Sequence, residues 1–130
     1  MEVKHTAGRT FVGVDAGFND MMRTVLYGAE HPIRICSTGG EELLGDLVGP
    51  ICESGDVFRT DVPMKVKEGS LVAILNVGAY GYSLSSNYLV RPRAPEIGSY
   101  KGEVFQMRRR ESDDDLAVNV NWERFEQFLN

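Results

Sequence analysis

The stretch Leu71-Val72-Ala73-Ile74-Leu75-Asn76-Val77 is the most apolar part of the chain, and it decides the fold class. A short run of this kind, bounded by turn residues, is typical of a central strand that is covered on both faces. Further strand-like segments span residues 10–15, 33–36, 42–48, 57–60 and 104–108, and the middle three of these are bounded by Gly, Pro or Asp. This spacing predicts a mainly β fold, either a barrel or a sandwich.

Helical patterns are few and short. Asp20 is expected to cap a helix over residues 21–27 that ends at Gly28, and the i, i+4 spacing places Arg23 and Tyr27 on one face of it. Near the C-terminus, the acidic run after Ser112 favours the start of a helical tail. No linker or repeat interrupts the chain, so we expect one domain over residues 1–130 with one or two short helices.

Charge and composition exclude several classes of function. The 130 residues carry 14 Lys and Arg against 19 Asp and Glu, a net charge of −5, so no nucleic acid partner is expected. No window approaches the ~20 consecutive apolar residues of a membrane helix, and the N-terminus has no apolar signal segment, so we expect no membrane association and a cytoplasmic location. Cys36, Cys52, His5 and His31 lack metal-ligand spacing, so no metal site is expected.

Two polar loops follow strongly apolar segments. The first is Gly49-Pro50-Ile51-Cys52-Glu53-Ser54-Gly55-Asp56, and the second spans residues 78–88 and is rich in Gly, Ser and Tyr. Taken alone, a Cys-Glu pair is most simply a small buried thiol beside a solvated turn residue. Because both loops begin where a predicted strand ends, however, we expect them to converge at one rim of the barrel, where their side chains are exposed.

These loops carry a resemblance to a known family. The matching blocks occur in the order found in diaminopimelate decarboxylases: Val14-Asp15-Ala16-Gly17-Phe18-Asn19-Asp20, then Arg23 and Leu26-Tyr27-Gly28-Ala29, His31-Pro32-Ile33, residues 48–56, residues 78–88 and Arg91-Pro92-Arg93-Ala94-Pro95-Glu96. The chain resembles the C-terminal β-domain of that family, which is similar to the C-terminal domains of alanine racemase and of eukaryotic ornithine decarboxylases. The resemblance implies a Greek-key-like β-barrel or sandwich.

The resemblance also implies a role for each candidate site residue. Cys52 corresponds to the acid that protonates the α-carbon after carbon dioxide leaves, a role that suits a thiol because thiols are mostly protonated near neutral pH. The substrate, meso-diaminopimelate, has a second amino-acid group at its far end. Arg23 would bind the distal carboxylate and Glu53 the distal ammonium. Tyr27 and Tyr80 would complete the substrate pocket, and Tyr80 would also contact the cofactor.

The implied cofactor is pyridoxal 5'-phosphate, which the family holds mainly on an N-terminal TIM-type barrel through a Schiff-base lysine. The lysines here are Lys4, Lys65, Lys67 and Lys101, and none lies in that motif. The chain alone is therefore expected to be inactive, with the N-terminal barrel domain as a partner. The resemblance further implies a homodimer with shared active sites, in which Cys52 and Glu53 serve the partner's site and the other three residues serve their own.

Two alternatives stay open at this point. The chain could be a free-standing β-barrel that binds a ligand or another chain without catalysis, or part of a sister decarboxylase acting on arginine, ornithine or a carboxylated polyamine. Cys36 has no counterpart in the family and is expected to be a buried structural thiol. No function is assigned to residues 118–130.

Overall fold

The computed structural model describes residues 1–129, so Asn130, the last residue of the predicted domain, lies outside the described residues. The chain forms two compact units, Met1–Ser85 and a second that begins at Ser86. The first contains β1 (Glu2–Thr6), β2 (Arg9–Gly13), α1 (Arg23–Tyr27), β3 (Ile33–Ile35), β4 (Glu41–Val48), β5 (Val57–Val66), β6 (Val72–Ile74) and α2 (Gly81–Leu84). The second contains the 3₁₀ turn η1 (Tyr88–Val90), β7 (Glu96–Tyr100), β8 (Glu103–Arg108), α3 (Asp113–Ala117) and α4 (Trp122–Leu129). The prediction of a mainly β fold is confirmed.

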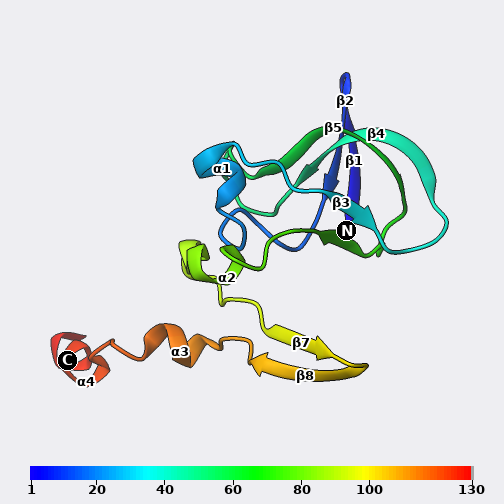
Figure 1. The fold of residues 1–130 in the computed structure, drawn as a ribbon. Coiled ribbons are helices and arrows are strands. Elements are labelled where there is room, and N and C mark those ends of the chain that lie inside the picture. The colour runs from blue at the N-terminus through cyan, green and yellow to red at the C-terminus, as the bar shows by residue number, and fades with distance from the viewer. Residues whose placement is uncertain (130) are drawn as a thin grey trace. The chain divides into compact units, whose positions relative to one another are not determined.

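The first unit is built on a four-stranded sheet with the order β1-β2-β4-β5 (Figure 1). β1 and β2 form an antiparallel hairpin that turns at Gly8, whose φ of 87° favours glycine. β2 pairs with β4 in parallel, which sets Val12 opposite Leu47. Both of these side chains are fully buried. Within the described residues this sheet is open, with β1 and β5 at its edges.

A second, two-stranded sheet packs against the same core. β3 and β6 pair antiparallel, and their half-buried side chains contact a buried cluster made of Val12, Met21, Leu47, Phe58, Met64 and Val66. The predicted strand over residues 71–77 is shorter than expected, and it lies beside β3 alone instead of at the centre of a sheet. It ends early because Asn76 adopts a left-handed conformation, with a φ of 60°.

β5 is longer than predicted, since it continues past Thr60 and through Pro63 to Val66. Proline is tolerated there because β5 lies at the edge of its sheet, where no further strand needs a backbone donor. The β4–β5 ladder is irregular around Asp46. The buried carboxylate of Asp46 accepts the backbone N–H of Asp61 at 3.0 Å and pairs with Arg9 at 2.7 Å, so it stabilises the irregularity.

Helix α1 is one turn long and lies beside the sheets (Figure 1). The prediction that Asp20 caps it is wrong, because the helix begins at Arg23 after Met22. Asp20 instead accepts the backbone N–H of Gly17 at 2.9 Å and closes the turn before the helix. The predicted end of the helix at Gly28 is confirmed, and Gly28 has a φ of 60°.

In the second unit, β7 and β8 form a hairpin that turns at Lys101 and Gly102, both with positive φ. Two residues of positive φ are the signature of a tight hairpin turn. The tail forms α4, and its large apolar side chains Trp122, Phe125 and Phe128 are all more than half exposed. Among residues 1–129, no helix combines the length and apolar character needed to cross a membrane.

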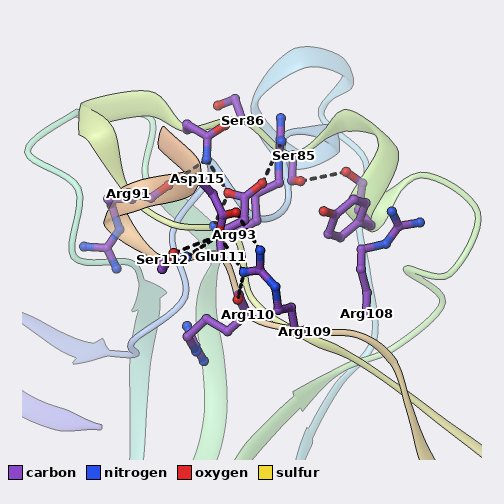
Figure 2. A network of polar contacts seen from close by, with 12 residues as sticks. Ser85, Ser86, Arg91, Arg93, Arg108, Arg109, Arg110, Glu111, Ser112 and Asp115 are labelled. Atoms are coloured by element: carbon purple, nitrogen blue, oxygen red, sulfur yellow. Dashed lines mark hydrogen bonds and ion pairs between the residues drawn. The ribbon is translucent and has the colours of Figure 1, made fainter. Parts of the chain in front are cut away.

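A polar network holds the middle of the second unit together. Figure 2 shows Glu111 beside Arg93, and Ser112 beside Asp115. The Glu111 carboxylate accepts the backbone N–H of Arg93 at 2.8 Å, the Arg93 guanidinium at 3.2 Å and the side-chain amide of Asn87 at 2.6 Å. The backbone N–H and hydroxyl of Ser112 donate to Asp115 at 2.8 and 2.9 Å, which stabilises the predicted helix start there.

Candidate functional site

Arg23, Tyr27 and Tyr80 form one cluster on the surface of the first unit. The guanidinium carbon of Arg23 lies 5.7 Å from the ring centre of Tyr27 and 5.3 Å from that of Tyr80. The first contact follows from the i, i+4 spacing on α1. The second joins α1 to the segment before α2, where the backbone N–H of Gly81 donates to the carbonyl of Val77 at 2.7 Å.

This cluster is open to solvent. Tyr27 is 65% exposed and Tyr80 is 54% exposed. Two aromatic faces beside the guanidinium restrict its side chain without removing its charge, because cation–π contacts leave the N–H groups available. A guanidinium held in this way is suited to bind a carboxylate or another anion through two parallel hydrogen bonds.

The loop that carries Cys52 and Glu53 is tightly folded. Backbone hydrogen bonds of 3.0 Å run from Gly49 N–H to the carbonyl of Asp56 and from Asp56 N–H to the carbonyl of Glu53. The side chain of Ile51 is buried, whereas Cys52 is exposed and its thiol is free. The sequence therefore folds locally to bury one apolar anchor and to present the adjacent thiol.

The two groups of site residues meet α1 from different sides. Gly55, in the Cys52 loop, packs under Val25, since a Cβ added to Gly55 would lie 3.4 Å from a methyl group of Val25. Val25 is two positions after Arg23, and two residues turn a helix by about 200°. The structure thus brings Arg23, Tyr27 and Tyr80 together and places the loop of Cys52 and Glu53 against the opposite face of the helix.

Asp56 lies in the same loop, but the sequence predicted no role for it. Its side chain is buried, and its carboxylate accepts two backbone N–H groups from separate segments. The signal available in the sequence was an acidic residue that closes a loop of small residues and begins a strand. The expectation for Cys36 is wrong, because that thiol is exposed after the short strand β3.

The lysines lie outside the elements that carry the candidate site residues. Lys4 lies in β1, Lys65 in β5 is paired with Glu42 at 3.4 Å, Lys67 directly follows β5, and Lys101 lies at the β7–β8 turn. Tyr80 and Arg23 together provide an accessible aromatic ring and a cation, which fit a planar, anionic cofactor non-covalently. In residues 1–129, no three His, Cys, Asp or Glu side chains gather as metal ligands.

Comparison with known proteins identifies relatives over most of the chain. The family described as "Pyridoxal-dependent decarboxylase, C-terminal sheet domain" matches residues 1–78. The diaminopimelate decarboxylase of Methanothermobacter thermautotrophicus is 42% identical over 116 residues, which cover 87% of this chain and 27% of that protein. The diaminopimelate decarboxylase of Escherichia coli K12 is 40% identical over 130 residues, with 89% and 31% covered.

Solved structures agree with these relatives. The diaminopimelate decarboxylase of M. jannaschii in complex with L-lysine superposes with a TM-score of 0.86 and 40% sequence identity, covering 92% of this chain and 28% of that one. The Helicobacter pylori enzyme with L-lysine superposes with a TM-score of 0.82 and 37% identity, covering 100% of this chain and 31% of that one. The chain thus spans about 30% of the length of the relatives that it matches.

Proposed function

We propose a function from one premise, which is that this chain belongs to the pyridoxal-dependent decarboxylase family and corresponds to its C-terminal sheet domain. The chain would be the substrate-recognition and dimerisation part of a diaminopimelate decarboxylase, which converts meso-diaminopimelate to L-lysine. The observation that carries this proposal is the half-buried Arg23, whose guanidinium lies beside the exposed rings of Tyr27 and Tyr80. The relatives' names and the L-lysine bound by two of them support the same substrate class.

Arg23 would bind the end of the substrate that does not react. Diaminopimelate carries a carboxylate and an ammonium at each end, so an enzyme that selects it must bind both groups of the distal end. The fork of the guanidinium matches a carboxylate in two parallel hydrogen bonds. A substrate that lacks the distal carboxylate would leave Arg23 unpaired, which is an effective way to reject it.

Glu53 would accept a hydrogen bond from the distal ammonium of the substrate. Cys52 would donate a proton to the α-carbon of the substrate after carbon dioxide leaves. The exposed, free thiol of Cys52 is accessible for this transfer. Because the Cys52 loop lies against the face of α1 opposite Arg23, we propose that Cys52 and Glu53 enter the site of a second copy. Arg23, Tyr27 and Tyr80 would serve the site of their own copy.

Pyridoxal 5'-phosphate, when bound, would supply the electron sink that decarboxylation of an amino acid needs. Tyr80 would contact it non-covalently, while its covalent anchor would come from an N-terminal barrel domain like that of the family. The open edges at β1 and β5 support the proposal that the sheets belong to a barrel that is completed by association.

The first experiment is a substrate panel on the full-length protein loaded with pyridoxal phosphate. Carbon dioxide release is measured with meso-diaminopimelate, L-arginine, L-ornithine, L-lysine and a carboxylated polyamine. We expect release from meso-diaminopimelate alone. A preference for another amino acid would support a sister decarboxylase instead, and absence of release from all five would favour a binding module without catalysis.

The second experiment tests whether sites are shared. Cys52→Ala and Arg23→Ala variants are each purified and then mixed under conditions that exchange subunits. The mixture is assayed at a substrate concentration well below the wild-type KM, where both variants are weak. If the sites are shared, it reaches about one quarter of wild-type activity, because half of the dimers are mixed and each mixed dimer holds one intact site of two. No recovery in a mixture shown to have exchanged subunits would place all five residues in one copy's site.

A further inference from the structure

Asp56 is a buried carboxylate to which the proposed mechanism gives no role. The residue is only 3% exposed. One carboxylate oxygen accepts the backbone N–H of Phe18 at 2.6 Å, and the other accepts the backbone N–H of Ile51 at 2.7 Å. Both bonds are short, as expected when the acceptor is charged.

The two donors come from the two segments that carry the proposed site. Ile51 immediately precedes Cys52 and Glu53. Phe18 lies in the turn that leads into α1, which carries Arg23 five residues later. The carboxylate of Asp56 therefore joins two segments of the chain, one at Phe18, 38 positions before Asp56, and one at Ile51, 5 positions before it.

The packing around the bridge supports it on both sides. The side chains of Phe18 and Ile51 are both buried. Gly17 has no side chain, and a Cβ there would overlap the side chain of Ile51. Similarly, a Cβ on Gly49 would overlap the Asp56 carboxylate. The absence of side chains at these two glycines lets the loop, the turn and the carboxylate approach closely.

We propose that Asp56 is a positioning residue that fixes the Cys52–Glu53 loop against the turn before α1, and so sets the spacing between the groups that bind the substrate's distal ammonium and distal carboxylate. This inference rests on the proposed function for its effect on substrate, but the bridge itself does not depend on it. Asp56 touches no substrate; it acts through Glu53, Cys52 and Arg23.

Replacing Asp56 by asparagine keeps the shape and removes half of the bridge. An amide has a single acceptor oxygen, and its NH₂ group cannot accept the second backbone N–H. The matched control is Asp20→Asn, which makes the same chemical change within the turn that Asp56 contacts at Phe18. Asp20 accepts only the N–H of Gly17, three residues away, among its described hydrogen bonds, so it does not join the two segments.

The functional readout is a ratio of inhibition constants in the full-length holoenzyme. L-lysine and cadaverine differ by one carboxylate at the end that does not face the cofactor. The ratio of the cadaverine constant to the L-lysine constant therefore measures recognition of that carboxylate, and the fraction of unfolded enzyme cancels from it. We expect Asp56→Asn to lower this ratio about tenfold and Asp20→Asn to leave it unchanged. An unchanged ratio in Asp56→Asn would overturn the positioning role.

The structural readout is amide hydrogen exchange of the same protein without ligand. In the wild type, the amides of Phe18 and Ile51 are expected to be protected and to open together. Asp56→Asn should speed exchange in both segments, whereas Asp20→Asn should speed it only in the turn near Gly17. Faster exchange in one of the two segments alone would contradict a bridge.

A second variant guards against a failure of Asp56→Asn to fold. Gly49→Ala keeps the charge of Asp56 but displaces its carboxylate, so it should reproduce both effects. If Gly49→Ala alters neither the ratio nor the exchange, Asp56 does not position the loop. If the exchange result holds while meso-diaminopimelate is not decarboxylated by the wild type, the bridge stands and the proposed function fails.

Discussion

Replacement of Arg23 by alanine tests the proposed substrate contact most directly. Arg23 lies 5.7 and 5.3 Å from the ring centres of Tyr27 and Tyr80, and exposed cation–π contacts contribute about 0.5–1 kcal/mol each. Their loss should therefore lower the free energy of unfolding by only about 1–2 kcal/mol. A hydrogen bond to a charged group contributes about 1.5–3 kcal/mol. Its loss should raise the KM for meso-diaminopimelate about 10- to 150-fold.

The assay is steady-state decarboxylation by the full-length enzyme at saturating pyridoxal phosphate. Arg23→Lys is the matched control, because it keeps the charge and loses the planar fork. The KM of Arg23→Lys should lie between those of the wild type and Arg23→Ala, while kcat changes little in either variant. A fall in kcat with an unchanged KM would refute the assignment of Arg23 to substrate binding, since a distal contact does not touch the reacting carbon.

Three further predictions concern other parts of the chain. Cys52→Ala should lower kcat by about 10²- to 10⁴-fold with little change in substrate affinity, and unchanged turnover in a single-turnover assay would reject the proton-donor role. Leu47→Ala, at a fully buried core position, should cost about 2–5 kcal/mol in urea unfolding; a smaller loss would mean that the sheet collapses around the cavity. The backbone N–H of Arg93 holds the pKa of Glu111 below its usual range, and the Arg109 side chain does the same for Asp115. Because each carboxyl group has a lower pKa in the folded second unit than in the unfolded chain, its ionised form stabilises this unit. This contribution is fully present at pH values above the usual carboxyl pKa of ~4. Amide exchange at Arg93 should therefore stay constant from pH 7 to 5, after correction for intrinsic rates, and its protection should fall as the pH drops through the lower pKa of folded Glu111. Loss of protection already near pH 6 would contradict this.

The sequence predicted the fold class because short apolar segments and turn residues are local signals. It missed β1, whose residues are mostly polar and exposed, because that strand is defined by its pairing with β2 and not by its own pattern. It also overestimated the strand around residues 71–77, since the left-handed Asn76 that ends the extended run has no marker in the apolar pattern.

In the candidate site, likewise, local sequence spacing predicted some contacts, whereas others depend on the tertiary fold. The spacing of Arg23 and Tyr27 predicted their contact, because i, i+4 residues on a helix are neighbours. The contact of Arg23 with Tyr80 joins segments more than fifty residues apart, and the resemblance to a family, not the spacing, indicated it. The bridge made by Asp56 had no sequence signal beyond its place in the loop, because burial of a carboxylate depends on donors from elsewhere in the chain.

Helix α1 explains why one short segment can serve two sites under the proposed function. A single turn of helix presents Arg23 and Tyr27 on one face and Val25 on the other, and Val25 packs over Gly55 in the loop of Cys52 and Glu53. In a two-fold dimer each copy gives and receives the same groups, so a rigid connection between these two faces would fix the geometry of both composite sites at once. The Asp56 bridge supplies that connection through backbone N–H groups, which side-chain substitutions on the surface do not remove. Substrate selectivity would then depend on a buried carboxylate that never contacts the substrate.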